Sequence, residues 1–487
     1  MGSGSRGRST QGCSERSPTW TCPTTTSSRR SRRFRALWAS LSAPEAFAAE
    51  LSRLVHEEQV RSRLPSLSAA AFCAGEVVWS DTVGLADIEG ATDATPETQY
   101  RIGSITKTFT AAGIMALRDE GKLALDDPLG KHVPEAPHAE PTLRRLLSHA
   151  SGLQREFPGE LWEQMLDPPR EELLASIAEA EQVLEPGAHW HYSNVAFALL
   201  GEVVERCSGM PWEGFLQERF LGPLGLARTT LAPSPPAARG YFVAPYEESV
   251  QVEEDMVLRR AAAAGQLWST AGDIARWGAF LADPDPGVLA LTSVEQMHAV
   301  QVMAEPDRWL RAWGLGLALH RQGDRILGGH GGAMPGHLAY FLYGRAERTG
   351  VALFANSSVW DRIEDFALEL AERAIEGLAA VPQPWRPEEP APPELAGLLG
   401  RWWTEGSEFV IRHRQGRLEA RLVDAPDWHP PSVFEPDGTD RLRVVSGRER
   451  GELLRVLRDD QGEPVKLYWA TYPCTRTPEI WRSTPNG

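Results

Sequence analysis

Residues 101–111 read RIGSITKTFTA and lead into an apolar segment that ends near Gly121. We predict a long helix after Tyr100, because glycine is typical just past a helix C-terminus. Ser104 and Lys107 are three positions apart, so a helix presents both on one face, within hydrogen-bonding reach. Free backbone N–H groups at the start of a helix also favour developing negative charge. This stretch therefore predicts a serine nucleophile paired with a lysine.

Lysine is scarce in this chain of 487 residues, whose 50 basic residues include only Lys107, Lys122, Lys131 and Lys466. Arginine stays protonated in proteins, whereas burial lowers the pKa of a lysine and lets its amine accept a proton. A Ser-x-x-Lys pair can still arise by chance, as a solvated pair on a helix surface. The interpretation therefore needs support from other parts of the chain.

A second polar motif, Tyr192-Ser193-Asn194, directly precedes a predicted helix over residues 195–207. One interpretation is structural, with Asn194 as the helix N-cap, a position that asparagine favours. The other interpretation is functional: Tyr192 exchanges a proton with Lys107, and the Asn194 amide hydrogen-bonds a substrate carbonyl. The motif alone leaves both open.

A third motif, GGHGGAMPG at residues 328–336, comes just before a predicted strand. It is either a glycine-rich turn or a strand at a sheet edge, where glycine permits close approach of a ligand or another backbone. In the second interpretation, His330 contributes a hydrogen-bond donor or a cation to a substrate cleft. The backbone N–H groups of Ala333 and Ser104 then form an oxyanion hole.

Together these motifs resemble the serine β-lactamase-related superfamily, in the branch of class C β-lactamases, D-Ala-D-Ala carboxypeptidases, D-aminopeptidases and related esterases. Further similar segments are LLSHASGL (146–153), PLGL (223–226) and the stretch 265–281 with STAGDI (269–274). The similarity covers about residues 60–380. The resemblance implies that Ser104 is acylated, with Lys107 and Tyr192 as general base and acid. It also implies that Asn194 positions the substrate, in a site between an α/β domain and a helical domain.

One position departs from the class C pattern, because His330-Gly331-Gly332 stands where those enzymes carry Lys-Thr-Gly. A histidine there is similar to peptidase and esterase members, and it is only partly charged at neutral pH. We expect it to anchor a substrate carboxylate less firmly, which counts against efficient β-lactam hydrolysis. The predicted activity is peptidase- or esterase-like cleavage of an amide or ester through acyl-Ser104, with His330, Gly332 and Ala333 at the substrate. The alternatives are a β-lactamase proper and a catalytically silent binding protein on the same fold.

Strands are predicted near both ends of residues 43–380, at 67–73, 77–83, 338–343 and 351–355, with helices between them. Such distant strands form one sheet only if the helical segment is an insertion, so the expected fold class is α/β. The resemblance implies a β-lactamase/transpeptidase-like fold, in which helices flank an antiparallel sheet beside an all-helical subdomain. Strands at 409–412, 417–422, 441–445, 453–457 and 465–469 predict a small all-β, barrel-like C-terminal domain. The predicted division is a disordered head (1–42), a hydrolase domain (43–380), a proline-rich linker (381–394) and the β domain (395–487).

The composition limits the partners of the protein. A net charge of −16 argues against a nucleic-acid-binding protein, which normally presents a basic face. No apolar run approaches the roughly 18 residues of a membrane span. The five widely spaced cysteines indicate neither a zinc site nor a disulfide framework, and the pair His189 and His191 has no acidic or thiol ligand close by. We expect no metal and no cofactor, and a small-molecule or peptide substrate; its identity and the oligomeric state are left open.

The start of the chain bears on localisation. An Arg-Arg pair within SSRRSRRFR (27–35) suggests export by a twin-arginine signal, but residues 36–49 are broken by Ser, Pro and Glu. A secretory signal needs a compact apolar run, which this segment lacks. We therefore expect a cytoplasmic protein, with export by an atypical signal as the alternative.

Overall fold

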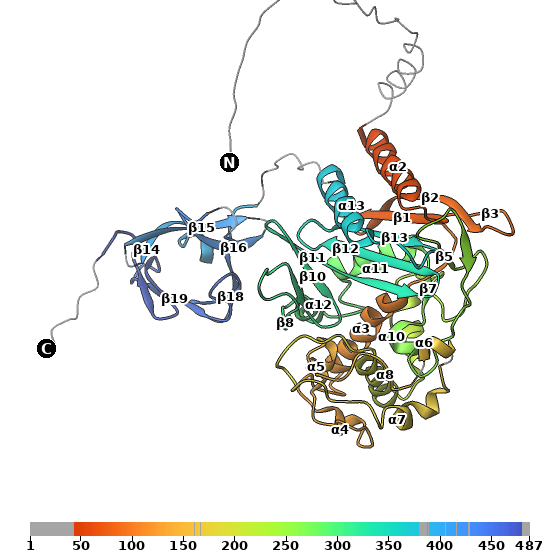
Figure 1. Ribbon diagram of the computed structural model, residues 1–487. Coiled ribbons are helices and arrows are strands. Elements are labelled where there is room, and N and C mark those ends of the chain that lie inside the picture. Colours follow the sequence, from red (N-terminus) through yellow and green to blue (C-terminus); the bar gives the residue numbers. More distant parts are fainter. Residues whose placement is uncertain are drawn as a thin grey trace, which may run out of the picture. The chain divides into compact units, whose positions relative to one another are not determined.

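The computed structural model describes residues 43–159, 161–165, 167–378, 387, 389–404, 406–414, 416–426 and 429–479. The predicted head over residues 1–42 lies outside the described residues, as does most of the first half of the predicted linker. The chain divides into two compact units, Met1–Ala379 and Ala380–Gly487, and each is described by itself (Figure 1).

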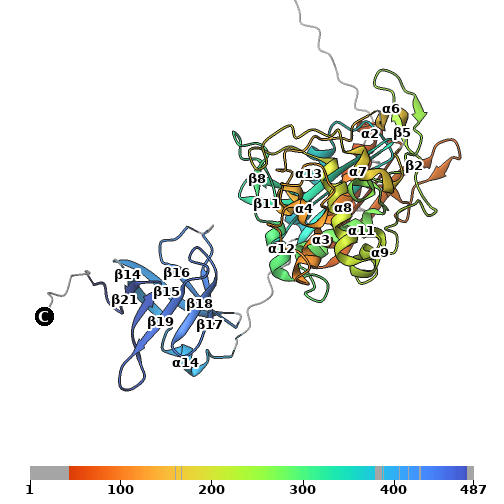
Figure 2. The same cartoon turned by 90° about the horizontal axis from the view of Figure 1, so that it is seen from below.

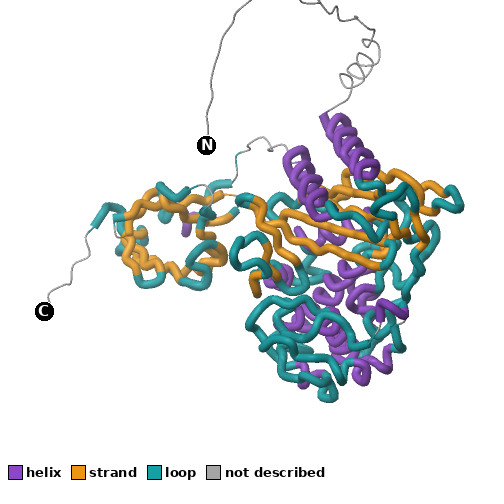
Figure 3. Tube along the Cα trace, viewed as in Figure 1, coloured by secondary structure: helices purple, strands orange, loops and turns teal. Residues whose placement is uncertain are grey.

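The first unit is built on a nine-stranded antiparallel sheet (Figure 3). The strands predicted at 67–73 and 77–83 are confirmed as β1 and β2, which form a hairpin, and those predicted at 338–343 and 351–355 are confirmed as β12 and β13; all four pair within this sheet. In spatial order the strands are β3 (Thr92–Asp93), β2 (Glu76–Asp87), β1 (Ser66–Cys73), β13 (Thr349–Ala355), β12 (His337–Gly344), β11 (Arg325–Met334), β10 (Ala318–Gln322), β9 (Arg311–Trp313) and β8 (Val302–Met303).

Helices cover both faces of this sheet, as Figures 1 and 2 show. On one face, α2 (Ala43–Arg61) and α13 (Ile363–Leu378) bury residues such as Leu51 and Leu370 against Leu353. On the other face, α11 (Ala271–Ala282) places Trp277 in a core with Phe341. Strand β13 is buried along its whole length, and its sequence TGVALFA is accordingly almost entirely without polar side chains.

An all-helical subdomain separates the early strands from the late ones, as predicted. Its elements are η1 (Gly103–Ile105), α3 (Thr106–Asp119), α4 (Leu129–His132), α5 (Leu143–Leu147), α6 (Leu161–Gln164), η2 (Arg170–Glu172), α7 (Leu173–Ser176), α8 (Asn194–Ser208), α9 (Trp212–Leu216), η3 (Gln217–Leu221) and α10 (Ala262–Gly265). The remaining elements of the first unit are two short antiparallel strand pairs, β4 (Tyr100–Arg101) with β7 (Trp268–Ser269) and β5 (Tyr241–Val243) with β6 (Val250–Val252), and helix α12 (Leu291–Met297).

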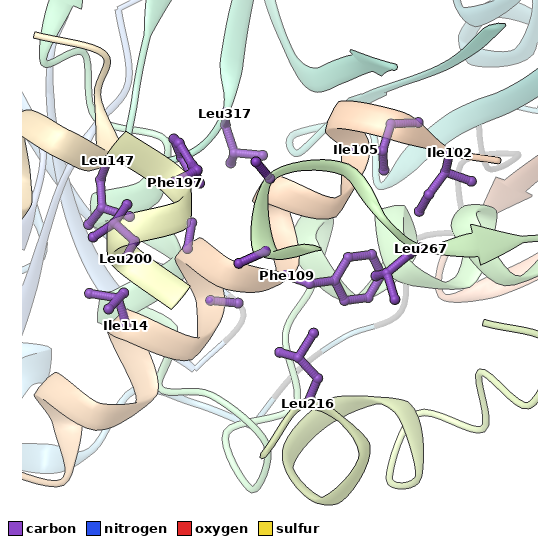
Figure 4. Packing of buried hydrophobic residues seen from close by; sticks show 14 of the residues in the cluster. Ile102, Ile105, Phe109, Ile114, Leu147, Phe197, Leu200, Leu216, Leu267 and Leu317 are labelled. Atoms are coloured by element: carbon purple, nitrogen blue, oxygen red, sulfur yellow. The ribbon is translucent and has the colours of Figure 1, made fainter. Parts of the chain in front are cut away.

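Helix α3 runs through the centre of the largest core and is buried from Thr106 to Leu117. Figure 4 shows Phe109 and Ile114 of this helix in one cluster with Phe197 of α8. Every side chain in this stretch is therefore removed from water, the lysine included. Of the helices in the described ranges, none is both long and apolar enough to cross a membrane.

The second unit is the predicted small β domain, and its barrel-like form is confirmed. Its eight strands form one antiparallel sheet in sequence order, and an antiparallel bridge from Trp403 to Thr475 nearly closes it. The core includes Trp402, Phe409 and Leu454. After the short helix α14 (Pro393–Ala396) the strands are β14 (Gly400–Thr404), β15 (Ser407–Arg414), β16 (Arg417–Leu422), β17 (Ser432–Pro436), β18 (Arg441–Ser446), β19 (Leu453–Arg458), β20 (Pro464–Trp469) and β21 (Tyr472–Cys474).

Candidate active site

The structure brings Ser104 and Lys107 together at the start of α3. Ser104 lies half-buried in the 3-10 turn η1, and Lys107 is fully buried one turn further on. The Lys107 Nζ donates a hydrogen bond to Ser104 Oγ over 3.0 Å. The preceding Gly103 has a φ of +47°, a conformation that favours glycine. The turn η1 therefore places the Ser104 hydroxyl next to the buried amine of Lys107.

Burial favours the neutral form of Lys107, whereas some of its contacts suit an ammonium. Its Nζ also donates to the Ala264 carbonyl over 2.6 Å, and it lies 5.1 Å from the ring centre of Tyr192. Burial lowers the pKa of Lys107 to about 7; the Glu156 carboxylate opposes this shift and the Arg155 guanidinium adds to it. A base whose pKa is near neutrality is well matched to proton transfer at neutral pH.

Tyr192 stands just before α8, beside the pair. Its ring stacks on the His149 imidazole, with centroids 4.1 Å apart. Burial raises the pKa of Tyr192 above its ordinary value, and a hydrogen bond with the Ser104 side chain offsets this only in part. The phenol therefore keeps its proton at neutral pH and can donate it.

The interpretation of Asn194 as a helix N-cap is wrong. The N-cap of α8 is Ser193, whose hydroxyl accepts from the Ala196 N–H over 3.1 Å. Asn194 is the first residue of the helix, and its Nδ2 donates to Glu156 Oε1 over 2.7 Å. Serine and asparagine are both good caps, so the choice depends on where the chain turns rather than on propensity.

The glycine-rich motif comes just before a strand, as predicted: residues 328–334 lie in strand β11, and Pro335 and Gly336 form the turn into β12. Strand β10 pairs with β11 only as far as Gly329, and the edge beyond it approaches η1. A Cβ on Gly332 would lie 1.9 Å from the Ile102 carbonyl oxygen and 3.3 Å from the Ser104 nitrogen. A Cβ on Gly103 would lie 2.7 Å from the Ala333 nitrogen. Only glycine permits this contact, which brings the Ser104 and Ala333 backbones close together.

His330 is buried, and its Nδ1 lies 2.6 Å from the Gly331 carbonyl oxygen. A carbonyl only accepts, so we assign the proton to Nδ1, which leaves Nε2 as an acceptor in the neutral ring. Burial, helped by the nearby Lys107 charge, lowers the pKa of His330 to about 3. Burial therefore disfavours a cation at His330, which was one of the two roles expected for it, because desolvation penalises the charged imidazole.

These groups meet at a cavity of about 690 Å³. Six of the seven predicted site residues line it, and Lys107 lies behind Ser104; the six are Ser104, Tyr192, Asn194, His330, Gly332 and Ala333. The ring of Trp313 packs 5.9 Å from Tyr192 and 5.5 Å from His330 between centroids, and forms part of an apolar wall. A mainly apolar cavity with a few convergent polar groups is typical of a small-molecule site.

Sequence reasoning missed four residues around this cavity. His149 supports the tyrosine, because its Nδ1 accepts from the Ser193 N–H over 3.0 Å while its ring stacks on Tyr192. It lies in a segment quoted for the family resemblance, which is the one signal that could have found it. Arg155 and Glu156, which act on the pKa of Lys107, and the Ala264 carbonyl carry no recognisable pattern.

Comparison with known proteins agrees with this geometry. The Beta-lactamase family model matches residues 47–374, well over half of the chain. The chain belongs to the Beta-lactamase family. Within the remaining part, residues 391–476 match a second model, described as "Domain of unknown function (DUF7586)". The predicted β-lactamase/transpeptidase-like fold and the predicted relation to this family are confirmed.

Several known proteins are similar to this chain. Beta-lactamase-like protein 2 of Dictyostelium discoideum is 28% identical over 466 residues, which span 88% of this chain and 83% of that protein. A D-aminopeptidase of Brucella anthropi is 25% identical over 82% of this chain and 72% of its own length. The solved D-stereospecific amidohydrolase of Streptomyces sp. superposes with a TM-score of 0.57 at 26% identity, over 66% of this chain and 98% of that one. Hydrolases are thus represented among the relatives.

Proposed function

We propose that the protein is a serine hydrolase that cleaves an amide or ester through an acyl-Ser104 intermediate. The observation that carries the proposal is the hydrogen bond of 3.0 Å from Lys107 Nζ to Ser104 Oγ, made by a lysine that is fully buried. Burial lowers the pKa of Lys107 to about 7, so a large share of the amine is neutral at physiological pH. Nucleophilic serines need such a base, since the free hydroxyl is a weak nucleophile.

Acylation begins with proton transfer from Ser104 Oγ to the neutral Lys107 amine. The oxygen forms a bond to the substrate carbonyl carbon, and the carbonyl electron pair moves onto its oxygen. The backbone N–H groups of Ser104 and Ala333 stabilise this oxyanion; the close approach of β11 to η1 supports that assignment. The negative charge develops next to the start of α3, where the helix dipole also favours it.

Collapse of the tetrahedral intermediate expels the leaving group, which needs a proton. The Tyr192 phenol, kept protonated by burial, donates it, and the Lys107 ammonium returns a proton to the phenolate. Water then attacks the acyl-enzyme by the same steps in reverse order, which releases a carboxylic acid and restores Ser104. No other group is consumed, so the cycle balances.

The site supports peptidase-, amidase- or esterase-like substrates over β-lactams. A neutral His330 offers an acceptor where a lysine would offer a cation, so it does not hold a substrate carboxylate by charge. Asn194, held by its bond to Glu156, lines the same cavity and positions the substrate. A β-lactamase proper and a catalytically silent binding protein remain the competing functions.

The test of the chemistry is covalent labelling by a fluorophosphonate probe. Wild type should be labelled and Ser104→Ala should not, while Ser80→Ala, which removes an exposed serine of β2, should behave as wild type. Absence of labelling in folded wild type would support the silent binding protein and end the enzyme proposal.

The test of the substrate class is a panel of p-nitrophenyl esters, D-amino-acid amides, D-Ala-D-Ala peptides and nitrocefin. We expect kcat/KM for at least one ester or amide to exceed that for nitrocefin. Preferred turnover of nitrocefin would instead support the β-lactamase alternative.

A further inference from the structure

Three charged side chains occur among the described residues that line the cavity in front of Ser104, and each of them is paired. The Nε of the exposed Arg155 lies 3.5 Å from Glu156 Oε1, and both residues belong to the lining. Arg311, the third, pairs with Glu364 of α13. Each positive charge of the wall is therefore offset by a carboxylate of the protein itself, which weakens its attraction for a charged group of a substrate.

The titratable groups of the lining add no further charge at neutral pH. Burial lowers the pKa of His320 to about 3, as it does for His330. The two tyrosines of the lining keep their protons, because burial raises their pKa values. Lys107 lies behind Ser104, where two protein oxygens accept hydrogen bonds from its Nζ. A substrate in this cavity therefore meets a wall that is close to electrically neutral.

Much of the same wall is aromatic. Trp190 and Trp313 both line the cavity, with ring centroids 5.4 Å apart. Trp162 of α6 adds a third indole, and it is 42% exposed. Phe157 and Leu161 add further apolar surface to the lining. Covering such surface with an apolar group is worth about 25 cal/mol per Å² removed from water, so the wall favours a bulky apolar group.

We infer that the preferred substrates of the Ser104 site are uncharged on both sides of the bond that is cleaved, and carry a bulky apolar group that packs against Trp162. The inference rests on the proposed function, since it names the substrate class of that same site. A charged group would lose its hydration in the cavity without a free counter-ion, a cost that a neutral group of the same shape does not carry. Neither a carboxylate nor an ammonium is then the feature that the site selects.

The experiment compares substrates of matched shape. One set consists of p-nitrophenyl esters whose acyl chains share five methylene groups and end in a tert-butyl, a trimethylammonium or a sulfonate group. A second set places the same three groups at the para position of phenyl acetate, so that the charge lies in the leaving group. Each kcat/KM is divided by the rate constant for hydrolysis by hydroxide. We expect the tert-butyl member of each set to exceed both charged members by roughly tenfold or more.

A variant of the aromatic wall tests the packing. Trp162→Ala removes the exposed indole, so kcat/KM for at least one tert-butyl substrate should fall roughly threefold to tenfold. Trp309→Ala is the matched control, because it removes an exposed tryptophan that stands outside the lining. Equal loss in the two variants would contradict the contact with Trp162.

A second variant tests the neutrality of the wall by undoing it. Glu364→Gln leaves the Arg311 guanidinium without its carboxylate, so the sulfonate esters should gain severalfold relative to the tert-butyl esters. Glu369→Gln is the control, because this carboxylate of the same helix pairs with Arg362 instead. An unchanged ratio in Glu364→Gln would show that pairing of Arg311 does not set the charge preference.

The outcomes separate this inference from the proposed function. A charged ester hydrolysed as fast as its tert-butyl counterpart would overturn the inference and leave the serine hydrolase standing. Labelling of Ser104 by the fluorophosphonate, together with no turnover of any tert-butyl substrate, would also overturn it. Loss of both labelling and turnover in the folded protein would instead end the proposed function, and the inference with it.

Discussion

The two cavities of this protein differ in the groups that they bury. The cavity of about 690 Å³ in the first unit stands in front of a lysine that is fully buried, and its walls include a tyrosine and a histidine whose pKa values burial displaces. The cavity of about 380 Å³ in the β domain is lined by hydroxyls, an indole and aromatic rings, together with Arg421, His429, Glu449 and the largely exposed Arg448.

This difference separates chemistry from binding. Proton transfer at neutral pH requires groups whose pKa values are moved by burial and neighbouring charges. Binding requires only shape, apolar surface and matched hydrogen bonds. The protonation of the groups that a cavity buries is therefore a better guide to its function than the volume of the cavity. Four predictions test the comparison.

The largest effect is expected from Lys107→Arg. A guanidinium stays protonated and cannot accept the Ser104 proton, so kcat/KM should fall about a hundredfold to ten-thousandfold. The matched control is Lys131→Arg, which changes an exposed lysine paired with Asp127. Turnover near the wild-type level in Lys107→Arg would show that the first cavity does not work through a lysine base.

A smaller loss is expected from Tyr192→Phe. The ring remains and can still stack on His149, so the fold is retained while the proton donor is lost. We expect kcat to fall roughly tenfold to a thousandfold, with the larger loss for amides, whose leaving group needs the proton more. Tyr246→Phe, at a fully exposed tyrosine, serves as the control. Equal activity of the two variants would remove Tyr192 from the mechanism.

The pH profile provides a finer test. Because the neutral amine of Lys107 is the base, kcat/KM should rise with pH and level off above about 7. Glu156 raises the pKa of Lys107 and Arg155 lowers it. Glu156→Gln should therefore move the acid limb to lower pH, and Arg155→Gln should move it to higher pH, each by roughly a few tenths of a unit. Shifts in the same direction would contradict the assignment, whatever the variants do to the maximal rate.

The smallest effect concerns stability. The folded-state pKa of Lys107, about 7, lies below its ordinary value of 10.5, so the unfolded chain binds more protons between these values. Burial of Lys107 therefore costs stability below pH 7, and the cost fades as pH rises toward 10.5. Lys107→Met should raise the free energy of unfolding at pH 6 by on the order of 1 kcal/mol, with a smaller gain at pH 9.

The control for stability is Lys466→Met in β20, where the side chain is half-buried. It should give no such pH-dependent gain. Denaturant unfolding followed by circular dichroism at both pH values measures the difference. A gain that does not depend on pH would mean that Lys107 is not held near neutrality by burial.

Much of the fold could be predicted because its signals are local. The hairpin of β1 and β2, the helix α3 and the end of α8 at Gly209 each follow from patterns within a few residues. Five of the eight barrel strands were predicted, whereas β14, β17 and β21 were missed. Two of those three run to five residues and the third to three, so each is shorter than the five predicted strands, which run to six or eight residues and give a stronger signal.

By itself, the sequence determined that Ser104 and Lys107 stand three positions apart at the start of a helix, a spacing that favours their contact. The roles of Tyr192, Asn194, Gly332 and Ala333 stay predictions that their shared cavity supports. Only the tertiary structure decided that His330 is neutral, that Ser193 caps α8, and that Lys107 donates to Ala264, 157 positions away. Protonation depends on burial and on charges nearby in space, and those neighbours are set by packing between segments that are distant in the chain.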